Sequence, residues 1–192
     1  MPFHFPAPVV LVLASGRGVR FAASGGTVHK LRAPLAGRAV LEHTLAAVRA
    51  SGLPWHLEDL GRPGMGDSIA AAVHATAGAP GWLVLPGDLP LVRPETLRAL
   101  ADALTASGCA VVVPEHQGER GHPVGFGAEC LQALQALTGE HGAASVVRQY
   151  AQQGRRVLRV RVEDEGTVTD VDTVQDLERA ERILAARYPE SG

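Results

Sequence analysis

The sequence has little of what marks several common classes of protein. It contains two cysteines, Cys109 and Cys130, and neither has the paired spacing of a zinc site. Both stand among apolar residues, which predicts reduced, structural thiols, although the sequence alone leaves a disulfide open. A serine nucleophile elbow and a recognisable Cys–His pair are absent as well. Zinc-dependent and covalent hydrolase chemistry therefore have no support in the sequence.

Long hydrophobic runs and a strong excess of basic charge are also missing. The apolar run at residues 9–14 is too short for a membrane span or for the core of a signal peptide, and no lysine or arginine precedes it. The formal net charge is −2, which gives no basic footprint for nucleic acid. We therefore expect a cytoplasmic protein with no nucleic-acid or membrane partner.

The length and the hydrophobic pattern predict one domain, residues 1–192, with an α/β fold. A chain of 192 residues, 46% of them hydrophobic, is long enough to bury one core. Short apolar runs alternate with segments of helical spacing, which indicates a sheet with helices on both faces. Strands are expected at 9–13, 55–60, 82–85, 109–113, 124–126 and 157–162, a polar loop at 115–122, and helices at 38–51, 69–77, 94–107, 129–137, 143–153 and 174–187.

The most informative stretch follows the first expected strand. Residues 14–18 form a glycine-rich loop of small residues, and basic side chains stand at Arg17, Arg20 and Lys30. Backbone N–H groups in such a loop lack carbonyl partners, so they can form a concave anion site that a phosphate approaches closely. The basic side chains would neutralise a polyphosphate. An ordinary strand-to-helix turn with exposed charges explains the loop about equally well, because short glycine motifs match often by chance.

Two familiar phosphate-binding motifs do not match this loop. A dinucleotide fingerprint that uses Gly16 and Gly18 needs a third glycine where Phe21 stands. A P-loop ends in Gly-Lys-Ser or Gly-Lys-Thr, and neither tripeptide occurs near the loop. The loop therefore indicates another way of binding phosphate.

Three aspartates stand near the ends of expected strands. Asp88 follows the strand at 82–85, while Asp170 and Asp172 alternate, so that on a strand both would face one side. Ligand sites of α/β sheets lie beyond the carboxyl ends of strands, and carboxylates there are suited to Mg²⁺. The alternatives are a turn aspartate at Asp88, a solvated Asp170 and a helix-capping role for Asp172.

Polar residues also mark the starts of two expected helices. Asp67 or Ser68 is expected to cap the helix at 69–77. Thr173 and Asp176 have close to the spacing of a capping box at the start of the last helix. These residues therefore have local structural explanations, whatever else they do.

Several motifs in order resemble the MobA-like nucleotidyltransferases. Leu-Ala-Ser-Gly-x-Gly-x-Arg-Phe, which begins at Leu13, is similar to the loop with which that family opens, and Lys30 follows as the family's lysine does. Gly-Asp-Leu-Pro-Leu-Val around Asp88 and Asp-Val-Asp-Thr from Asp170 are similar to later motifs, with Val174 where proline is usual. The sequence is most similar to the branch of molybdenum cofactor cytidylyltransferases.

The resemblance implies a Rossmann-like three-layer sandwich with a mostly parallel mixed sheet, of the nucleotide-diphospho-sugar transferase type. It implies the transfer of CMP from CTP to a phosphate-bearing acceptor, the molybdopterin cofactor, with release of pyrophosphate and with Mg²⁺ as cofactor. It also allows a molybdoenzyme or its chaperone as a protein partner. Arg20, Lys30 and Asp88 would be catalytic residues, and Asp88, Asp170 and Asp172 would hold the metal.

The resemblance further implies a set of ligand-binding residues. Gly-Met-Gly-Asp-Ser from Gly64 is similar to a segment that lines the base and ribose pocket, where glycines would let a ring approach closely. Gly-His-Pro-Val around His122 is similar to a motif on the acceptor side, although a lone histidine in a turn is more often structural. The implied binding residues are Leu13, Ala14, Ser15, Gly16, Arg17, Gly18, Gly64, Gly66, Asp67, Ser68 and His122.

The sequence departs from the family pattern in two further places. Residues 53–63 are shorter and more polar than the strand and helix usual there, and Ala144 replaces an arginine that the family uses near the acceptor. Two alternatives therefore stay open. One is a relative that uses GTP, or another acceptor such as a sugar or lactate phosphate. The other is a catalytically weak nucleotide-binding accessory protein.

Overall fold

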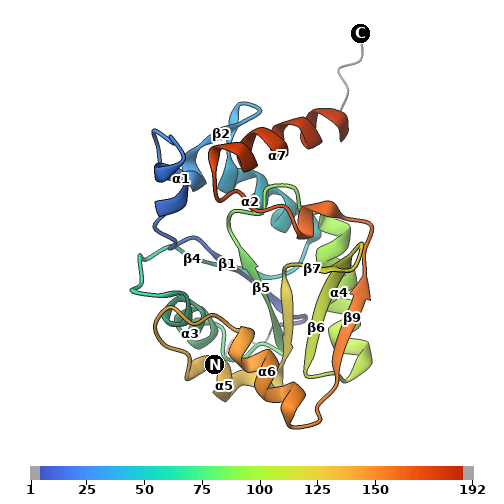
Figure 1. Ribbon diagram of the computed structural model, residues 1–192. Helices are drawn as coiled ribbons and strands as arrows, with labels where there is room; N and C mark the ends of the chain where they lie inside the picture. Colours follow the sequence, from blue (N-terminus) through green and yellow to red (C-terminus); the bar gives the residue numbers. More distant parts are fainter. Residues whose placement is uncertain (1–4, 188–192) are drawn as a thin grey trace.

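The computed structural model describes residues 5–187, which form one mixed sheet with helices on both faces (Figure 1). Its strands are β1 (Val9–Leu13), β4 (Trp55–Glu58), β5 (Gly81–Pro86), β6 (Val111–His116), β7 (Glu119–Arg120), β8 (Val124–Gly127) and β9 (Val157–Arg161). The order of the 7-stranded sheet is β4-β1-β5-β8-β6-β7, and β9 pairs with β6. Strands β7 and β8 run against the other five. The expected α/β fold with a mostly parallel mixed sheet is confirmed.

The helices follow the expected alternation with strands. They are α1 (Val19–Ala23), α2 (Val40–Ser51), α3 (Met65–Ala75), α4 (Pro94–Ser107), α5 (Leu131–Gln135), α6 (Ala144–Gln152) and α7 (Val174–Arg187). A small hairpin of β2 (Pro34–Leu35) and β3 (Arg38–Ala39) precedes α2. No helix within residues 5–187 is long and apolar enough to cross a membrane.

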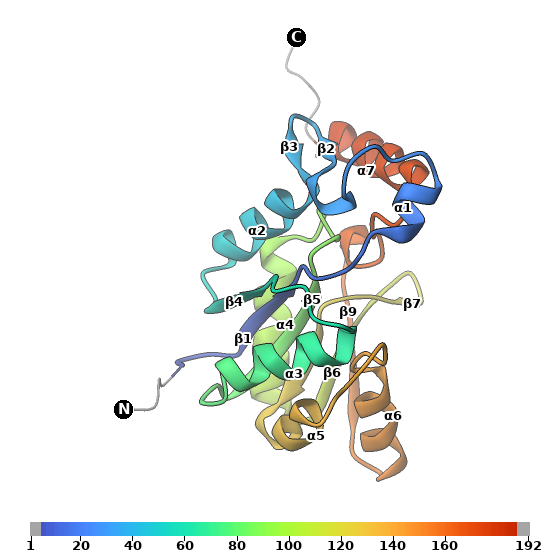
Figure 2. The ribbon, with the colours of Figure 1, turned by 90° about the vertical axis from the view of Figure 1, so that its left-hand side faces the viewer.

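Strand β1 shows why the sheet is covered on both sides. All five of its residues are buried, as its continuous apolar sequence requires. Because side chains alternate along a strand, Val10 and Val12 pack toward α2 and α4, while Val9 and Leu11 pack toward α3 and α5 (Figure 2). The sheet therefore forms the middle of three layers.

A third apolar cluster holds α7 and the β2–β3 hairpin beyond the carboxyl ends of the strands, at the top of Figure 1. Phe21 of α1 and Leu35 of β2 contribute to it together with Ala180 of α7. The backbone N–H of Val174 donates to Ser24 Oγ at 2.9 Å, so the start of α7 is fixed beside α1. The chain's last helix is thereby brought next to its first loop.

The ends of β1 and β5 meet the segment that precedes α7. Gly87 N–H donates to the Leu13 carbonyl at 2.9 Å, and a Cβ on Gly87 would lie 3.0 Å from that oxygen. Val171 N–H donates to the Asp88 carbonyl, also at 2.9 Å. The sheet therefore brings the glycine loop and Asp88 to one edge, as their strand-end positions predicted. Residues 170–172 reach the same edge, but the strand expected to carry them is wrong, because they lie in a loop between residues 165–167 and α7.

The start of α3 differs from expectation. The helix begins at Met65, and neither Asp67 nor Ser68 caps it. Ser68 lies one turn inside, where its N–H donates to the Gly64 carbonyl at 3.2 Å. The Asp67 carboxylate instead accepts a hydrogen bond from Gly139 N–H at 3.0 Å. A contact from a distant loop, which local spacing does not reveal, replaces the expected cap.

The start of α7 confirms one prediction and corrects another. Thr173 and Asp176 form the expected capping box: Asp176 Oδ2 accepts from Thr173 N–H at 2.8 Å, and Thr173 Oγ1 accepts from Asp176 N–H at 3.2 Å. The capping role considered for Asp172 is wrong, because its carboxylate is turned toward Lys30 and Arg20.

The polar segment at 115–122 is a hairpin in place of the expected loop. Strand β6 continues to His116 and pairs with β7 across a two-residue turn at Gln117 and Gly118. Both turn residues have positive φ, 49° and 87°, as the tightest hairpin turn requires. Gln-Gly is a less frequent pair there than Asn-Gly, so the local sequence gives little indication of the hairpin.

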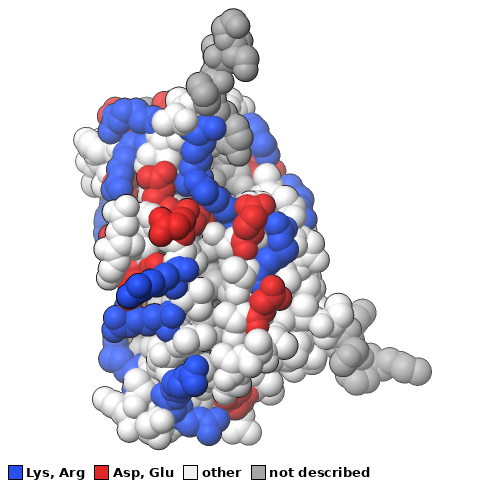
Figure 3. Space-filling model, turned by 90° about the vertical axis from the view of Figure 1, so that its right-hand side faces the viewer, with Lys and Arg blue, Asp and Glu red and all other residues white. Residues whose placement is uncertain are grey.

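The β9 edge of the sheet carries charges of both signs (Figure 3). Arg159 of β9 pairs with Glu115 of β6 at 3.2 Å, and Arg155 pairs with Glu129 at 3.2 Å. Charged side chains on an edge strand disfavour pairing with another chain.

Candidate active site

A pocket of about 390 Å³ opens at the carboxyl end of β1. It lies between the glycine loop and the first turn of α3. The predicted site residues in its lining are Leu13, Ser15, Gly16, Arg17, Gly18, Arg20, Lys30, Gly64, Ser68, Asp88 and Asp172. The predicted residues outside its lining are Ala14, Gly66, Asp67, His122 and Asp170.

The glycine loop presents unpaired donors to this pocket. Within residues 5–187, the backbone N–H groups of residues 15–18 donate to no protein acceptor. Gly18 has a φ of 64°, a left-handed conformation that favours glycine, and it precedes α1. A Cβ on Gly16 would meet no protein atom within 4 Å, so the space above the loop is open to a ligand. Such a run of N–H groups suits phosphate oxygens.

Two side chains hold the loop in shape. His29 Nδ1 accepts a hydrogen bond from Leu31 N–H at 3.3 Å, which assigns the proton to Nε2, and Nε2 donates to the Gly16 carbonyl at 2.7 Å. On the other side, Ser15 Oγ lies 2.6 Å from Ser68 Oγ of α3. The loop is therefore fixed at both ends before any ligand binds. No sequence motif had pointed to His29.

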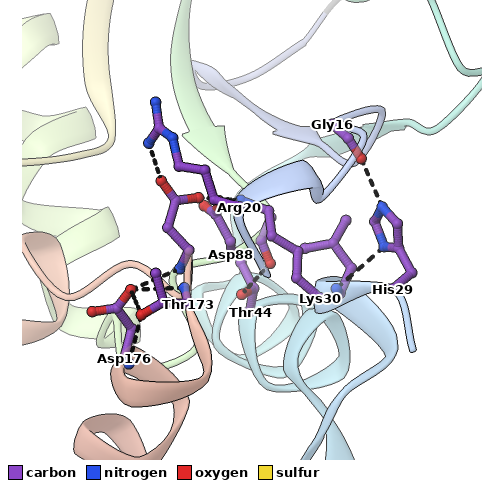
Figure 4. A network of polar contacts seen from close by, with 11 residues as sticks. Gly16, Arg20, His29, Lys30, Thr44, Asp88, Thr173 and Asp176 are labelled. Atoms are coloured by element: carbon purple, nitrogen blue, oxygen red, sulfur yellow. Dashed lines mark hydrogen bonds and ion pairs between the residues drawn. The ribbon is translucent and has the colours of Figure 1, made fainter. Parts of the chain in front are cut away.

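Lys30 is the central charge of the pocket (Figure 4). Its Nζ lies 2.6 Å from Asp88 Oδ2 and 2.6 Å from Asp172 Oδ1, and 9% of the residue is exposed. Burial alone would lower the pKa of Lys30, but the two carboxylates outweigh it and raise the pKa above its ordinary value. The ammonium group therefore stays charged at neutral pH.

Asp172 forms ion pairs with two basic side chains. Besides Lys30, Arg20 places Nη1 2.5 Å from Asp172 Oδ2, although the Arg20 side chain is 80% exposed. Burial opposes ionisation of Asp172, yet these contacts together hold its pKa below the ordinary value. Asp172 is thus an ionised partner of Lys30. The other guanidinium N–H groups of Arg20 make no hydrogen bond within residues 5–187, which leaves them for a ligand.

Asp88 keeps one carboxylate oxygen without a partner. Its Oδ2 accepts from Lys30, whereas Oδ1 is buried and has no hydrogen bond among the described residues. Asp170 lies nearby, since the N–H of the next residue, Val171, donates to the Asp88 carbonyl at 2.9 Å. Burial and then the charge of Asp88 raise the pKa of Asp170. An unpartnered buried carboxylate oxygen beside a second carboxylate fits a divalent cation, which prefers oxygen ligands. Asp172 is occupied by Lys30, and no group of three His, Cys, Asp or Glu side chains suited to a metal occurs within residues 5–187.

His122 lies near Asp88 without lining the pocket. Burial lowers the pKa of His122, and the charge of Asp88 opposes that shift. Its backbone N–H donates to the Thr167 carbonyl at 2.9 Å, which fixes the turn. The imidazole is therefore neutral at neutral pH and within reach of the charge of Asp88.

Gly64 and Gly66 lie where the loop at 138–142 packs against α3, and their lack of a side chain makes room for that loop. A Cβ on Gly64 would lie 2.1 Å from the Gly139 carbonyl oxygen, and one on Gly66 would lie 2.8 Å from the His141 carbonyl oxygen. Gly66 N–H donates to the Gly139 carbonyl at 2.8 Å. These glycines thus dock the loop at 138–142 onto α3, in contrast to the close approach of a ring that the resemblance implied.

Two charged residues in the pocket lining are not among those predicted from the sequence. Glu140 comes from the docked loop, and Arg62 comes from the segment after β4. Arg62 Nε donates to Oε1 of the buried Glu58 at 3.2 Å. Glu58 ends β4 much as Asp88 follows β5, so its position was a signal that could have drawn attention to this end of the pocket.

Comparison with known proteins identifies the family. The sequence model of the MobA-like NTP transferase domain matches residues 47–155. The chain belongs to the MobA-like nucleotidyltransferase family. A 2-C-methyl-D-erythritol 4-phosphate cytidylyltransferase from Cereibacter sphaeroides is 36% identical, over 91% of this chain and 96% of that relative.

Solved structures show the same fold as this MobA-like nucleotidyltransferase. A nucleotidyl transferase from Methanothermobacter thermautotrophicus superposes with a TM-score of 0.76 at 22% identity, over 95% of this chain and 99% of the other. The manganese complex of Rv0371c from Mycobacterium tuberculosis gives a TM-score of 0.68 at 22% identity, over 92% and 98%. The resemblance read from the glycine loop and the aspartates is therefore confirmed at the level of family and fold.

Proposed function

We propose that this nucleotidyltransferase moves CMP from CTP to a small molecule that carries a phosphate, with release of pyrophosphate. The observation that carries the proposal is the run of unpaired N–H groups at residues 15–18 beside the charged Lys30. Together they form a site for a triphosphate. The choice of CTP is supported by the relative named a cytidylyltransferase.

The reaction needs no general base in the protein. A phosphate monoester is largely doubly ionised at neutral pH, since its second pKa is about 6, so its oxygen can attack the α-phosphorus directly. A new P–O bond forms as the bond from the α-phosphorus to the bridging oxygen breaks, and pyrophosphate takes the electron pair. The loop N–H groups would hold the phosphates in line, while Lys30 and Arg20 would neutralise the developing charge.

We assign Asp88 and Asp170 as the residues that hold the divalent cation, taken here as Mg²⁺. The unpartnered Asp88 Oδ1 and the neighbouring Asp170 supply hard oxygen ligands. When bound, the cation supplies positive charge to the phosphate oxygens. In this proposal Asp172, the third carboxylate expected at the metal, serves as the partner of Lys30. We assign His122, whose pKa burial lowers, to the acceptor side.

The acceptor has two candidates. The resemblance to molybdenum cofactor cytidylyltransferases supports molybdopterin, with a molybdoenzyme or its chaperone as recipient. The relative that is 36% identical over 91% of this chain supports 2-C-methyl-D-erythritol 4-phosphate instead. Ala144, which replaces the arginine of the molybdopterin pattern, favours this second candidate. We place the reaction in the cytoplasm, which suits the two buried free thiols, Cys109 and Cys130.

Pyrophosphate release with each nucleotide and each acceptor tests the proposal. With Mg²⁺ and the correct acceptor, we expect CTP to be used about tenfold or more better than GTP, because base hydrogen bonds left unpaired in a pocket are costly. The panel contains CTP, GTP, ATP and UTP with molybdopterin, 2-C-methyl-D-erythritol 4-phosphate and a sugar phosphate. A clear preference for GTP would place the chain in a GTP-using branch. Binding of CTP without release from any acceptor would favour the accessory-protein alternative.

A further inference from the structure

Lys30 is the only lysine in the sequence, among 18 lysine and arginine residues. It lies in the pocket, where it contacts Asp88 Oδ2 and Asp172 Oδ1 at 2.6 Å each. An ammonium group is a compact charge that can turn between several acceptors, whereas the planar guanidinium of arginine favours one fixed fork. A lysine at this position is therefore suited to exchange one partner for another.

The charges around Lys30 and Asp88 nearly cancel without any ligand. Asp88, Asp170 and Asp172 carry three negative charges, while Lys30 and Arg20 carry two positive ones, which leaves one negative charge. A divalent cation would turn this sum to one positive charge. A free cation at Asp88 would also lie close to the ammonium of Lys30, because both bind the same carboxylate, and the low exposure of Lys30 limits screening by water.

A triphosphate would relieve the repulsion between the cation and the ammonium group of Lys30. Its oxygens would supply new acceptors for Lys30, whose side chain lines the pocket together with the glycine loop. Once Lys30 turns toward the phosphates, the second oxygen of Asp88 is released for the cation. The cation and the triphosphate thus each favour the binding of the other.

We propose that Lys30 is a counter-ion that keeps free divalent cations out of the Asp88 site and yields it to a cation carried by a nucleoside triphosphate. This inference rests on the proposed function for the identity of the triphosphate. It goes beyond that function in assigning to Lys30 two opposite effects, one on free metal and one on nucleotide.

Binding of Mn²⁺ to Lys30→Gln, followed by electron paramagnetic resonance, tests the proposal without any turnover. Without nucleotide, we expect Lys30→Gln to bind Mn²⁺ about tenfold more tightly than the wild type, since an adjacent charge shifts carboxylate equilibria by about this much or more. The same variant should bind CTP with Mn²⁺ about tenfold more weakly than the wild type. Arg148→Gln, the matched loss of one positive charge on exposed α6, should change neither affinity.

The outcomes separate this inference from the proposed function. Equal or weaker binding of free Mn²⁺ by Lys30→Gln would overturn the inference, whatever happens with CTP. Failure of the wild type to bind CTP with Mn²⁺ would overturn the proposed function and, with it, the exchange of partners. The tighter binding of free Mn²⁺ should vanish when Lys30→Gln is combined with Asp88→Asn. Tighter binding that persists in the double variant would also contradict the inference.

A second measurement uses the wild type and so does not depend on a variant that folds. Protein labelled with ¹³C and ¹⁵N only in lysine gives one side-chain signal, that of Lys30. Mg²⁺ alone should leave this signal in place, and CTP with Mg²⁺ should shift it. A shift by Mg²⁺ alone equal to that with CTP and Mg²⁺ would overturn the proposal.

Discussion

Asp88→Asn is expected to keep the fold and to lose most pyrophosphate release, by roughly a hundredfold or more. The amide has the size of the carboxylate, and its oxygen can still accept the hydrogen bond of Lys30. It removes the charge on which cation binding depends, and it leaves Lys30 with one charged partner, Asp172. Turnover should therefore fall far more than CTP affinity, to which the loop N–H groups and Arg20 still contribute.

The comparison for this variant is Asp102→Asn, which makes the same change on the exposed face of α4, outside the pocket. Steady-state rates at saturating CTP and the temperature of thermal unfolding should be measured for both. Normal Mg²⁺-dependent release by Asp88→Asn would refute the assignment of Asp88. An Asp88→Asn protein that has lost its cooperative unfolding transition would show a structural role instead.

Asp170→Asn should weaken the metal site and stabilise the metal-free protein. Burial and the charge of Asp88 raise the pKa of Asp170 above its ordinary value of 3.8, so the folded state disfavours the ionised carboxylate. The folded state therefore loses stability as the pH rises from about 3.8 through the folded pKa, and the loss is complete at neutral pH. Asparagine cannot ionise, so it avoids the loss but provides a poorer metal ligand.

Thermal unfolding in EDTA between pH 3 and pH 8 measures this effect. At neutral pH, Asp170→Asn should unfold about 1 to 3 °C above the wild type. The shift is small because Asp170 is exposed as a residue and its carboxyl group is only half-buried, so water screens the repulsion. The difference should close as the pH falls through the folded pKa. Saturating Mg²⁺ should stabilise the wild type more than the variant. A variant no more stable than the wild type at neutral pH would show that Asp170 and Asp88 do not repel each other.

The sequence was most informative where local chemistry decides the structure. Helices α4 and α7 have the predicted bounds, 94–107 and 174–187. Proline in the first turn and a left-handed Gly108 define α4, while the capping box defines the start of α7. The pocket residues on the glycine loop were also predictable, since a strand followed by small residues leaves N–H groups unpaired.

The contacts that complete the site depend on distant parts of the chain. Docking of the loop at 138–142 onto α3 joins residues 72 positions apart, and it explains Gly64, Gly66 and Asp67 better than any local rule. Lys30, Asp88 and Asp172 were each singled out, but their mutual ion pairs appear only when the turn at 30–32, the end of β5 and the start of α7 meet. Pattern and spacing place residues on elements, whereas pairing requires the tertiary fold.

Titration of ¹⁵N-labelled wild type with CTP and Mg²⁺, followed by amide resonances, tests the central claim most directly. If the glycine loop holds the triphosphate, the amide signals of residues 15–18 should move together, with larger shifts than any in α6, because new hydrogen bonds form at those N–H groups. The account predicts saturation of these shifts by CTP, and by pyrophosphate at higher concentration. Unchanged amide signals at residues 15–18 while CTP binds elsewhere would contradict it.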